Sequence, residues 1–256
     1  MQFDFTPGIV LPALAAPIAL AVALRTWRFR TLPGATPFVF IAAIAVIWSA
    51  FNAMELATAA HLSQKRIGRT AYPVDPYIVH PLRNVLRLIR LGCTDTDVLS
   101  ATALHDTVED QPREVVSILD ESRLSDGPNQ QAALNLITEH ISPETSRLVA
   151  AVSNPSTDSV LSKAEKNAAY AAHVADVIKD PKVFLVKFAD FVDNAGSVQF
   201  LDDETKRAKL AAKYAPVVPV FASAFGIIRH GLNLPQQGLD AIDERLTSLT
   251  RSLTST

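Results

Sequence analysis

Two long uncharged segments near the start of this 256-residue chain constrain its folding more than any other feature. Residues 5–24 and 35–54 contain no Asp, Glu, Lys or Arg. Each is about as long as the twenty residues with which a helix crosses the hydrocarbon layer of a bilayer. From Glu55 onward the chain is rich in charge, as in a water-soluble protein. We therefore predict two apolar, membrane-spanning helices in residues 1–54 and a globular domain in residues 55–256.

The basic residues around these segments give a contradictory signal for membrane topology. The loop over residues 25–30 contains three arginines, which favours a cytoplasmic loop by the positive-inside tendency. Lys65, Arg66 and Arg69 follow the second segment and favour a cytoplasmic location for the chain after that segment. We expect membrane association through residues 5–54, with the globular domain in the cytoplasm. The alternative is that both segments form the apolar core of a soluble protein.

The rest of the chain has the apolar periodicity of consecutive helices. Turn-forming clusters separate the periodic segments, and Pro112, Pro143 and Pro181 lie where a first-turn proline begins a helix. No run of alternating β-branched residues predicts a strand. The predicted fold class is all-α, with helices over residues 77–91, 96–108, 114–124, 130–139, 160–178, 181–197, 202–228 and 237–253.

Charge and cysteine content exclude several classes of function. The formal net charge is −2, which is too small to indicate a nucleic-acid partner. The single cysteine, Cys93, excludes an internal disulfide framework and suits a reducing compartment. The sequence identifies no protein partner.

A cluster of polar residues interrupts these apolar helices. His105 and Asp106 are adjacent in an apolar segment, and Glu109 and Asp110 follow one helical turn later. Burying both side chains of the His-Asp pair costs free energy unless a partner satisfies them, and a divalent metal would satisfy both. Buried water is the alternative partner. The apolar periodicity predicts that residues 105–110 lie on one helix, on which residues four apart share a face.

Two further residues extend this set to a complete metal site. His80 in PYIVHP and Asp190 in VKFADFVDN come from other predicted helices. Mixed imidazole and carboxylate donors suit Mn²⁺ or another borderline divalent ion. Such an ion lowers the pKa of bound water, and a nearby acid can accept its proton. His80 could instead cap a helix. The pattern predicts a metal-dependent hydrolase.

Four motifs together resemble a known family. AAHLSQKR, PYIVHPL, ALHDTVED and VKFADFVDN occur in the order found in the hydrolase domain of RelA/SpoT-type proteins and the small alarmone hydrolases, which belong to the HD superfamily. The resemblance runs from about residue 52 to the C-terminus. It implies a helical, Mn²⁺-dependent enzyme that removes the 3′-pyrophosphate of guanosine tetra- and pentaphosphate.

The resemblance also implies roles for individual residues. The metal ligands would be His80, His105, Asp106 and Asp190. Glu109 and Asp110 match the acidic pair that handles the attacking water. Residues that would contact the nucleotide are Arg66 at the guanine base, Asn194 and Ser197 at the nucleoside, and Lys187 at phosphate. Tyr170 is a candidate for the wall of a pocket, whereas we expect the remaining histidines to be surface or structural residues, namely His61, His140, His173 and His230.

Departures from the family pattern leave two alternative functions open. Ile67 stands where a basic residue is common, and the loop before Tyr77 is longer than usual. These changes favour another nucleotide substrate for the same chemistry, such as NADPH. The segment before residue 60 resembles the first membrane helices of seven-helix sensor regions in bacterial histidine kinases. That likeness favours a non-catalytic, nucleotide-binding sensor module.

Overall fold

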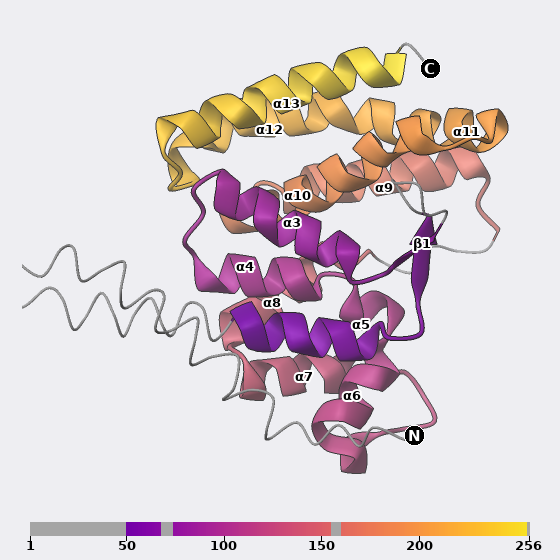
Figure 1. Ribbon diagram of the computed structural model, residues 1–256, viewed down its shortest axis with the longest axis vertical. Helices are drawn as coiled ribbons and strands as arrows, with labels where there is room; N and C mark the ends of the chain where they lie inside the picture. The colour runs from indigo at the N-terminus through magenta and orange to yellow at the C-terminus, as the bar shows by residue number, and fades with distance from the viewer. Residues whose placement is uncertain (1–49, 68–73, 155–159, 255–256) are drawn as a thin grey trace, which may run out of the picture.

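The computed structural model describes residues 50–67, 74–154 and 160–254, and within them it confirms the predicted all-α fold (Figure 1). The predicted apolar helices lie almost entirely in residues 1–49, outside the described residues. A helix over residues 50–60 opens the described part. The elements that follow are β1 (Lys65–Ile67), β2 (Val74–Pro76), α3 (Val79–Arg90), α4 (Thr96–Leu104), α5 (Thr107–Asp110), α6 (Pro112–Asp120), α7 (Gln130–His140), α8 (Pro143–Val152), α9 (Lys163–Val177), α10 (Pro181–Ser197), α11 (Glu204–Tyr214), α12 (Val218–Ile228) and α13 (Gln236–Thr254).

Local sequence signals explain where the helices begin. The three predicted first-turn prolines open α6, α8 and α10, as expected. Asp95 and Asp180 cap α4 and α10 by accepting hydrogen bonds from backbone N–H groups of the first turn. Ser162 and Glu165 form a capping box at the start of α9.

Helix α10 is the central element of the bundle. It packs against α3, α4, α8 and α13, and its side chains are buried around most of its circumference. Phe184, Phe188 and Phe191 contact Phe221 of α12, with the rings of Phe191 and Phe221 stacked 4.7 Å apart. Because this side of α10 is filled by aromatic rings, Asp190 and Asp193 lie on another side, where they contact residues of α3 and the residue after α4.

The predicted helix boundaries were wrong in three places. The segment 96–108 is not one helix, because α4 ends at Leu104 and α5 begins at Thr107. The segment 202–228 is divided between α11 and α12 by the 3₁₀ turn Ala215–Val217, which contains Pro216. Helix α8 was not predicted, although its first residue, Pro143, was recognised as a helix start.

Two short strands and one apolar helical stretch complete the description. Strands β1 and β2 pair antiparallel, with Arg66 opposite Asp75. Among the described residues, the continuous stretch Glu204–Gly231 is long and apolar enough to cross a membrane by length and composition alone. Its residues Val217, Phe221 and Phe225 are buried in the bundle, which explains their apolar character.

The helix over residues 50–60 belongs to the bundle. Ala53, Leu56, Ala57 and Ala60 are buried in the common core. The predicted domain boundary between residues 54 and 55 therefore falls inside this helix.

Candidate functional site

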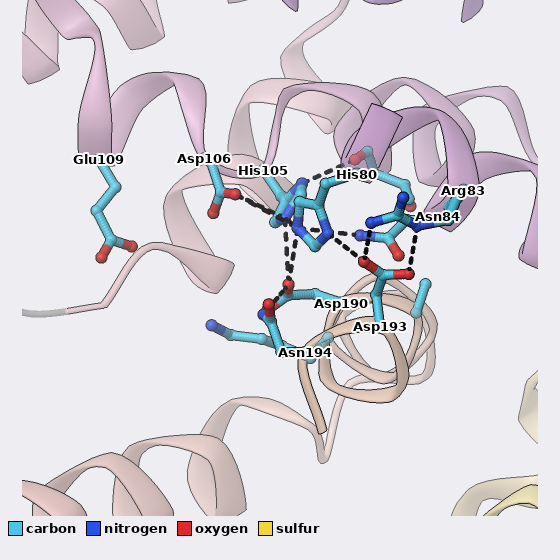
Figure 2. A network of polar contacts seen from close by, with 12 residues as sticks. His80, Arg83, Asn84, His105, Asp106, Glu109, Asp190, Asp193 and Asn194 are labelled. Carbon is cyan, nitrogen blue, oxygen red and sulfur yellow. Dashed lines mark hydrogen bonds and ion pairs between the residues drawn. The ribbon is translucent and has the colours of Figure 1, made fainter. Parts of the chain in front are cut away.

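Four of the residues singled out in the sequence converge in space (Figure 2). His80 lies on α3, His105 and Asp106 lie between α4 and α5, and Asp190 lies on α10. The Nε2 atom of His80 is 3.1 Å from Nε2 of His105 and 3.1 Å from Oδ1 of Asp190. The Nε2 atom of His105 is also 3.1 Å from Oδ2 of Asp106. Three segments distant in the sequence thus bring two imidazoles and two carboxylates together.

The break between α4 and α5 determines how His105 and Asp106 are presented. His105 follows the last residue of α4, and Asp106 precedes the first residue of α5. The prediction of one continuous helix over residues 105–110 is therefore wrong. Thr107 is buried and donates a hydrogen bond from Oγ1 to the carbonyl of Leu104, at 2.7 Å, across this break. At this break the adjacent side chains of His105 and Asp106 face the same centre.

Hydrogen bonds on the far side of each imidazole determine its tautomer. Nδ1 of His105 is 2.9 Å from the carbonyl oxygen of Thr102, so this nitrogen carries the proton. Nδ1 of His80 is 2.7 Å from Oδ2 of Asp193, which also requires a donating nitrogen. With Nδ1 donating in each ring, the Nε2 atoms of both imidazoles face the cluster, and each offers a lone pair when its ring is neutral. Two lone pairs facing each other at 3.1 Å require a cation between or beside them.

The pKa values of the cluster agree with this requirement. Burial opposes a charged imidazolium at His105, but the carboxylates of Asp106 and Asp190 outweigh burial and raise the pKa of His105 to about 10. Burial also opposes ionisation of these two carboxyls, yet the imidazoles hold the pKa of both below the usual range. The raised pKa favours a protonated His105 in the metal-free protein, and a divalent metal could supply the positive charge instead. His80, His105 and Asp190 form a group that could hold such an ion.

Asp193 is the residue behind the cluster that sequence reasoning missed. Its carboxylate is fully buried and accepts hydrogen bonds from Arg83, at 3.0 Å, and from Arg87, at 3.2 Å, as well as from His80. Asn84 also lies beside His80, with Nδ2 3.4 Å from Nε2. A helical face could have revealed these residues, because positions three, four and seven after His80 and three after Asp190 share a face with those ligands.

The acidic pair lies on α5, beside the cluster rather than within it. Figure 2 shows Glu109 to one side of Asp106, where its carboxylate bonds to Asn154. Asp110 is an exposed residue, yet partial desolvation and then the charges of Asp106 and Glu109 raise its pKa to about 6. Both acids border the space next to the four converging side chains.

The predicted nucleotide contacts are brought together only in part. Arg66 on β1 donates from Nη2 to Oδ1 of Asn194 at 2.5 Å, and Asn194 donates from Nδ2 to Oδ1 of Asp190 at 2.5 Å. The Arg66–Asn194 pair therefore adjoins the cluster. In contrast, the hydroxyl of Ser197 bonds to the carbonyl of Asp193 in its own helix. Lys187 is buried and donates to Oδ1 of Asn154 at 3.4 Å.

Tyr77 was given no role from the sequence and His61 was expected to be a surface or structural residue, yet both adjoin the cluster. The hydroxyl of Tyr77 donates to Oδ2 of Asp106, and its ring lies beneath the guanidinium of Arg66, 5.3 Å from the ring centroid. His61 is buried and stacks on Tyr77 with ring centroids 4.4 Å apart. His61 is therefore a buried structural residue that packs next to the site.

A large cavity opens beside Glu109. Its volume is about 820 Å³, and α5, the ends of α7 and α8, α9 and α11 surround it. Tyr170 lines its wall, as expected from the sequence, together with His173 and Asn167. Three lysines also line the cavity and make it electropositive around the single carboxylate of Glu109, namely Lys163, Lys166 and Lys213. A polyanion would be attracted to this cavity.

Comparison with known proteins agrees with the cluster of histidines and aspartates. A family model described as "HD domain" matches residues 53–228, which is most of the chain. The chain belongs to the HD-domain family. The matched residues include every member of the cluster and both acids of α5.

The relatives of this HD-domain chain are RelA/SpoT-type proteins, which confirms the resemblance drawn from the motifs. It is 29% identical over 176 residues to the guanosine-3′,5′-bis(diphosphate) 3′-pyrophosphohydrolase of Aquifex aeolicus. It is 30% identical over 176 residues to a probable GTP pyrophosphokinase of Mycobacterium leprae. Each match covers 69% of this chain but only 21% and 19% of the relatives, so the chain spans about a fifth of their length.

A solved structure shares the fold. It is a metazoan ortholog of SpoT described as hydrolysing ppGpp, and it superposes with a TM-score of 0.55. The comparison covers 80% of this chain and 94% of the other, with 20% sequence identity. At this identity the likeness establishes a common HD-type bundle.

Proposed function

We propose that this chain hydrolyses the 3′-pyrophosphate of guanosine tetra- and pentaphosphate with the help of a divalent metal. The observation that carries the proposal is the convergence of two Nε2 lone pairs and two carboxylates beside an acidic pair and an electropositive cavity. The names of the two curated relatives and the metazoan neighbour support guanine nucleotides as substrates.

His80, His105, Asp106 and Asp190 would hold the metal. Their two nitrogens and two carboxylate oxygens favour Mn²⁺ or a similar ion over one that prefers sulfur ligands. Such an ion supplies Lewis-acid chemistry, because it lowers the pKa of water and polarises phosphoryl oxygens. Asp193 and the carbonyl of Thr102 keep both imidazoles in the ligating tautomer.

The remaining residues of the site bind the substrate and move the proton. Glu109 and Asp110 orient the attacking water and accept its proton, since they border the cluster without belonging to it. Arg66 packs on the base, and Asn194 and Ser197 contact the nucleoside. Lys187 and the lysines that line the cavity attract the phosphates.

A nucleotide panel tests this proposal. Purified, Mn²⁺-loaded protein is expected to release pyrophosphate from guanosine tetraphosphate, and Asp106→Ala or Glu109→Ala is expected to lower kcat by about 100-fold or more. NADPH and other nucleotides assayed in parallel identify a different substrate if their kcat/KM is much higher. Tight nucleotide binding without turnover over hours would instead indicate the sensor module.

Membrane association through residues 5–54 is part of the same proposal. The uncharged segments support it, and the helix over residues 50–60 would connect them to the HD domain. Cytoplasmic placement would give the site access to nucleotides. Protease digestion of sealed bacterial membrane vesicles tests both points, because a domain exposed only on the outer face of the cell membrane would contradict a cytoplasmic enzyme.

A further inference from the structure

Asn154 holds the carboxylate of Glu109 through three donated hydrogen bonds. Its backbone N–H lies 2.9 Å from Oε2 of Glu109, and its side-chain Nδ2 lies 3.2 Å from Oε1 and 3.1 Å from Oε2. Asn154 immediately follows Ser153, the C-cap residue of α8. A residue 45 positions away in the sequence therefore engages both oxygens of the acid.

Lys187 determines which way the amide of Asn154 faces. The Oδ1 atom of Asn154 is 3.4 Å from Nζ of Lys187, a buried lysine on α10 three residues before Asp190. A lysine ammonium only donates hydrogen bonds, and a carboxylate only accepts them. The amide oxygen must therefore face Lys187 while the amide nitrogen faces Glu109. If the amide were reversed, its oxygen would face the carboxylate of Glu109 and its NH2 group would face the ammonium of Lys187, and neither pair can form a hydrogen bond.

This arrangement restricts an otherwise mobile acid. Glu109 is exposed, and an exposed glutamate loses considerable rotamer entropy when it is held in one geometry. Hydrogen bonds to an ionised group are shorter and stronger than those between neutral groups. Asn154 and Lys187 together connect the acid on α5 to the same helix that carries Asp190.

We propose that Asn154 is a positioning residue that orients the Glu109 carboxylate toward the attacking water. The inference rests on the proposed function, because it acts through the role of Glu109. Asn154 belongs to none of the four motifs that resemble the family, so its assignment comes from the contacts alone. The side chain of Asn154 is exposed at the end of a helix, so its loss leaves the core unchanged.

Substitution of Asn154 tests the proposal in the full-length, Mn²⁺-loaded protein. Asn154→Ala removes the side-chain bonds but keeps the backbone bond, and we expect kcat on guanosine tetraphosphate to fall about 10-fold with KM within about two-fold. Asn154→Asp faces Glu109 with a second carboxylate, and we expect a larger loss. Mn²⁺ affinity and the melting temperature should stay at the wild-type values in both variants.

Asn135→Ala is the matched control. Asn135 is an exposed residue on α7 whose side chain accepts a hydrogen bond from Gln131 at 2.9 Å. Its substitution by alanine therefore removes a surface hydrogen bond of an asparagine side chain, as Asn154→Ala does. We expect wild-type kcat and KM for this variant.

A double-mutant cycle separates positioning from a direct or structural role. In a Glu109→Ala background, Asn154→Ala should cause no further loss of kcat, because a residue that acts through Glu109 has nothing left to orient. Independent, multiplicative losses would overturn the proposal, and so would an Asn154→Ala variant with wild-type kcat. Wild-type protein that turns over no nucleotide would instead refute the proposed function, and the inference with it.

Discussion

At the scale of single residues, the site depends on side chains that hold other side chains. Asp193 and Thr102 direct the imidazoles, Asn194 joins Arg66 to Asp190, and Asn154 joins Glu109 to Lys187. These partners fix the tautomers and rotamers of the candidate ligands and of the acid Glu109. Variants of such partners should therefore change function more than their modest contact energies suggest.

Asp193→Asn tests the support of His80. The neutral amide has one acceptor oxygen and no charge, so it cannot both accept from His80 and serve as the counter-charge and second acceptor for Arg83 and Arg87. We expect Mn²⁺ affinity to fall roughly 10- to 100-fold, measured by isothermal titration calorimetry. Asp176→Asn is the control, because Asp176 is an exposed acid on α9 that forms an ion pair with Lys179, just after that helix. Unchanged Mn²⁺ affinity in Asp193→Asn would contradict the role of this carboxylate.

Asp110→Asn tests the pH dependence of stability in the metal-free protein. The pKa of Asp110 is about 6 in the folded state, raised by burial and then by Asp106 and Glu109, and near 3.8 ordinarily. A carboxyl with a raised folded-state pKa destabilises the fold as pH rises from about 4 to about 6. Asp110→Asn should therefore increase the free energy of unfolding at pH 7 by roughly 1 kcal/mol, allowing for solvent screening, and change little near pH 4.

Thermal unfolding in the presence of a chelator at both pH values measures this effect. An equal change at the two pH values would show that the side chain acts through packing rather than charge.

At the scale of helices and strands, the position of each element depends on a few close contacts. The break between α4 and α5 presents His105 and Asp106 to the cluster, and the hairpin of β1 and β2 presents Arg66. Helix α13 crosses the end of α3 where Gly238 meets the backbone of Leu91. No side chain would fit at that crossing.

Gly238→Ala and Gly226→Ala form a matched pair for this crossing. A Cβ atom at Gly238 would lie 2.0 Å from the carbonyl oxygen of Leu91, so α13 would have to shift. We expect a loss of roughly 1–3 kcal/mol in the free energy of unfolding by urea. A Cβ atom at Gly226, within α12, meets nothing within 4 Å. Alanine at this position should increase the free energy of unfolding by at most about 1 kcal/mol. Equal effects at both positions would contradict the close approach.

At the scale of the whole molecule, the candidate ligands come from three parts of the bundle. Helix α3, the α4–α5 junction and α10 each contribute, so an ion bound among them would link α10 to ligands that lie more than 80 residues earlier in the sequence. An ion that binds the folded chain and not the unfolded chain adds its binding free energy to stability.

Mn²⁺ is therefore expected to raise the melting temperature. At about 100 times the dissociation constant the gain is about 2.7 kcal/mol, which corresponds to roughly 5–10 °C for a domain of this size. His105→Ala should abolish the shift, whereas His140→Ala, a substitution in the last turn of α7 away from the cluster, should keep it. A shift of equal size in His105→Ala would contradict metal binding at this cluster.

The sequence by itself determined the helical class, most helix starts and the set of candidate ligands, because these depend on signals a few residues long. A proline or an Asp cap acts on its own first turn, and apolar periodicity acts within one helix. Only the tertiary structure decided that α4 ends at Leu104, that Asp193 lies behind His80 and that Asn154 forms hydrogen bonds with Glu109. These features join positions up to 113 residues apart, and their energies depend on packing and burial that no local segment contains.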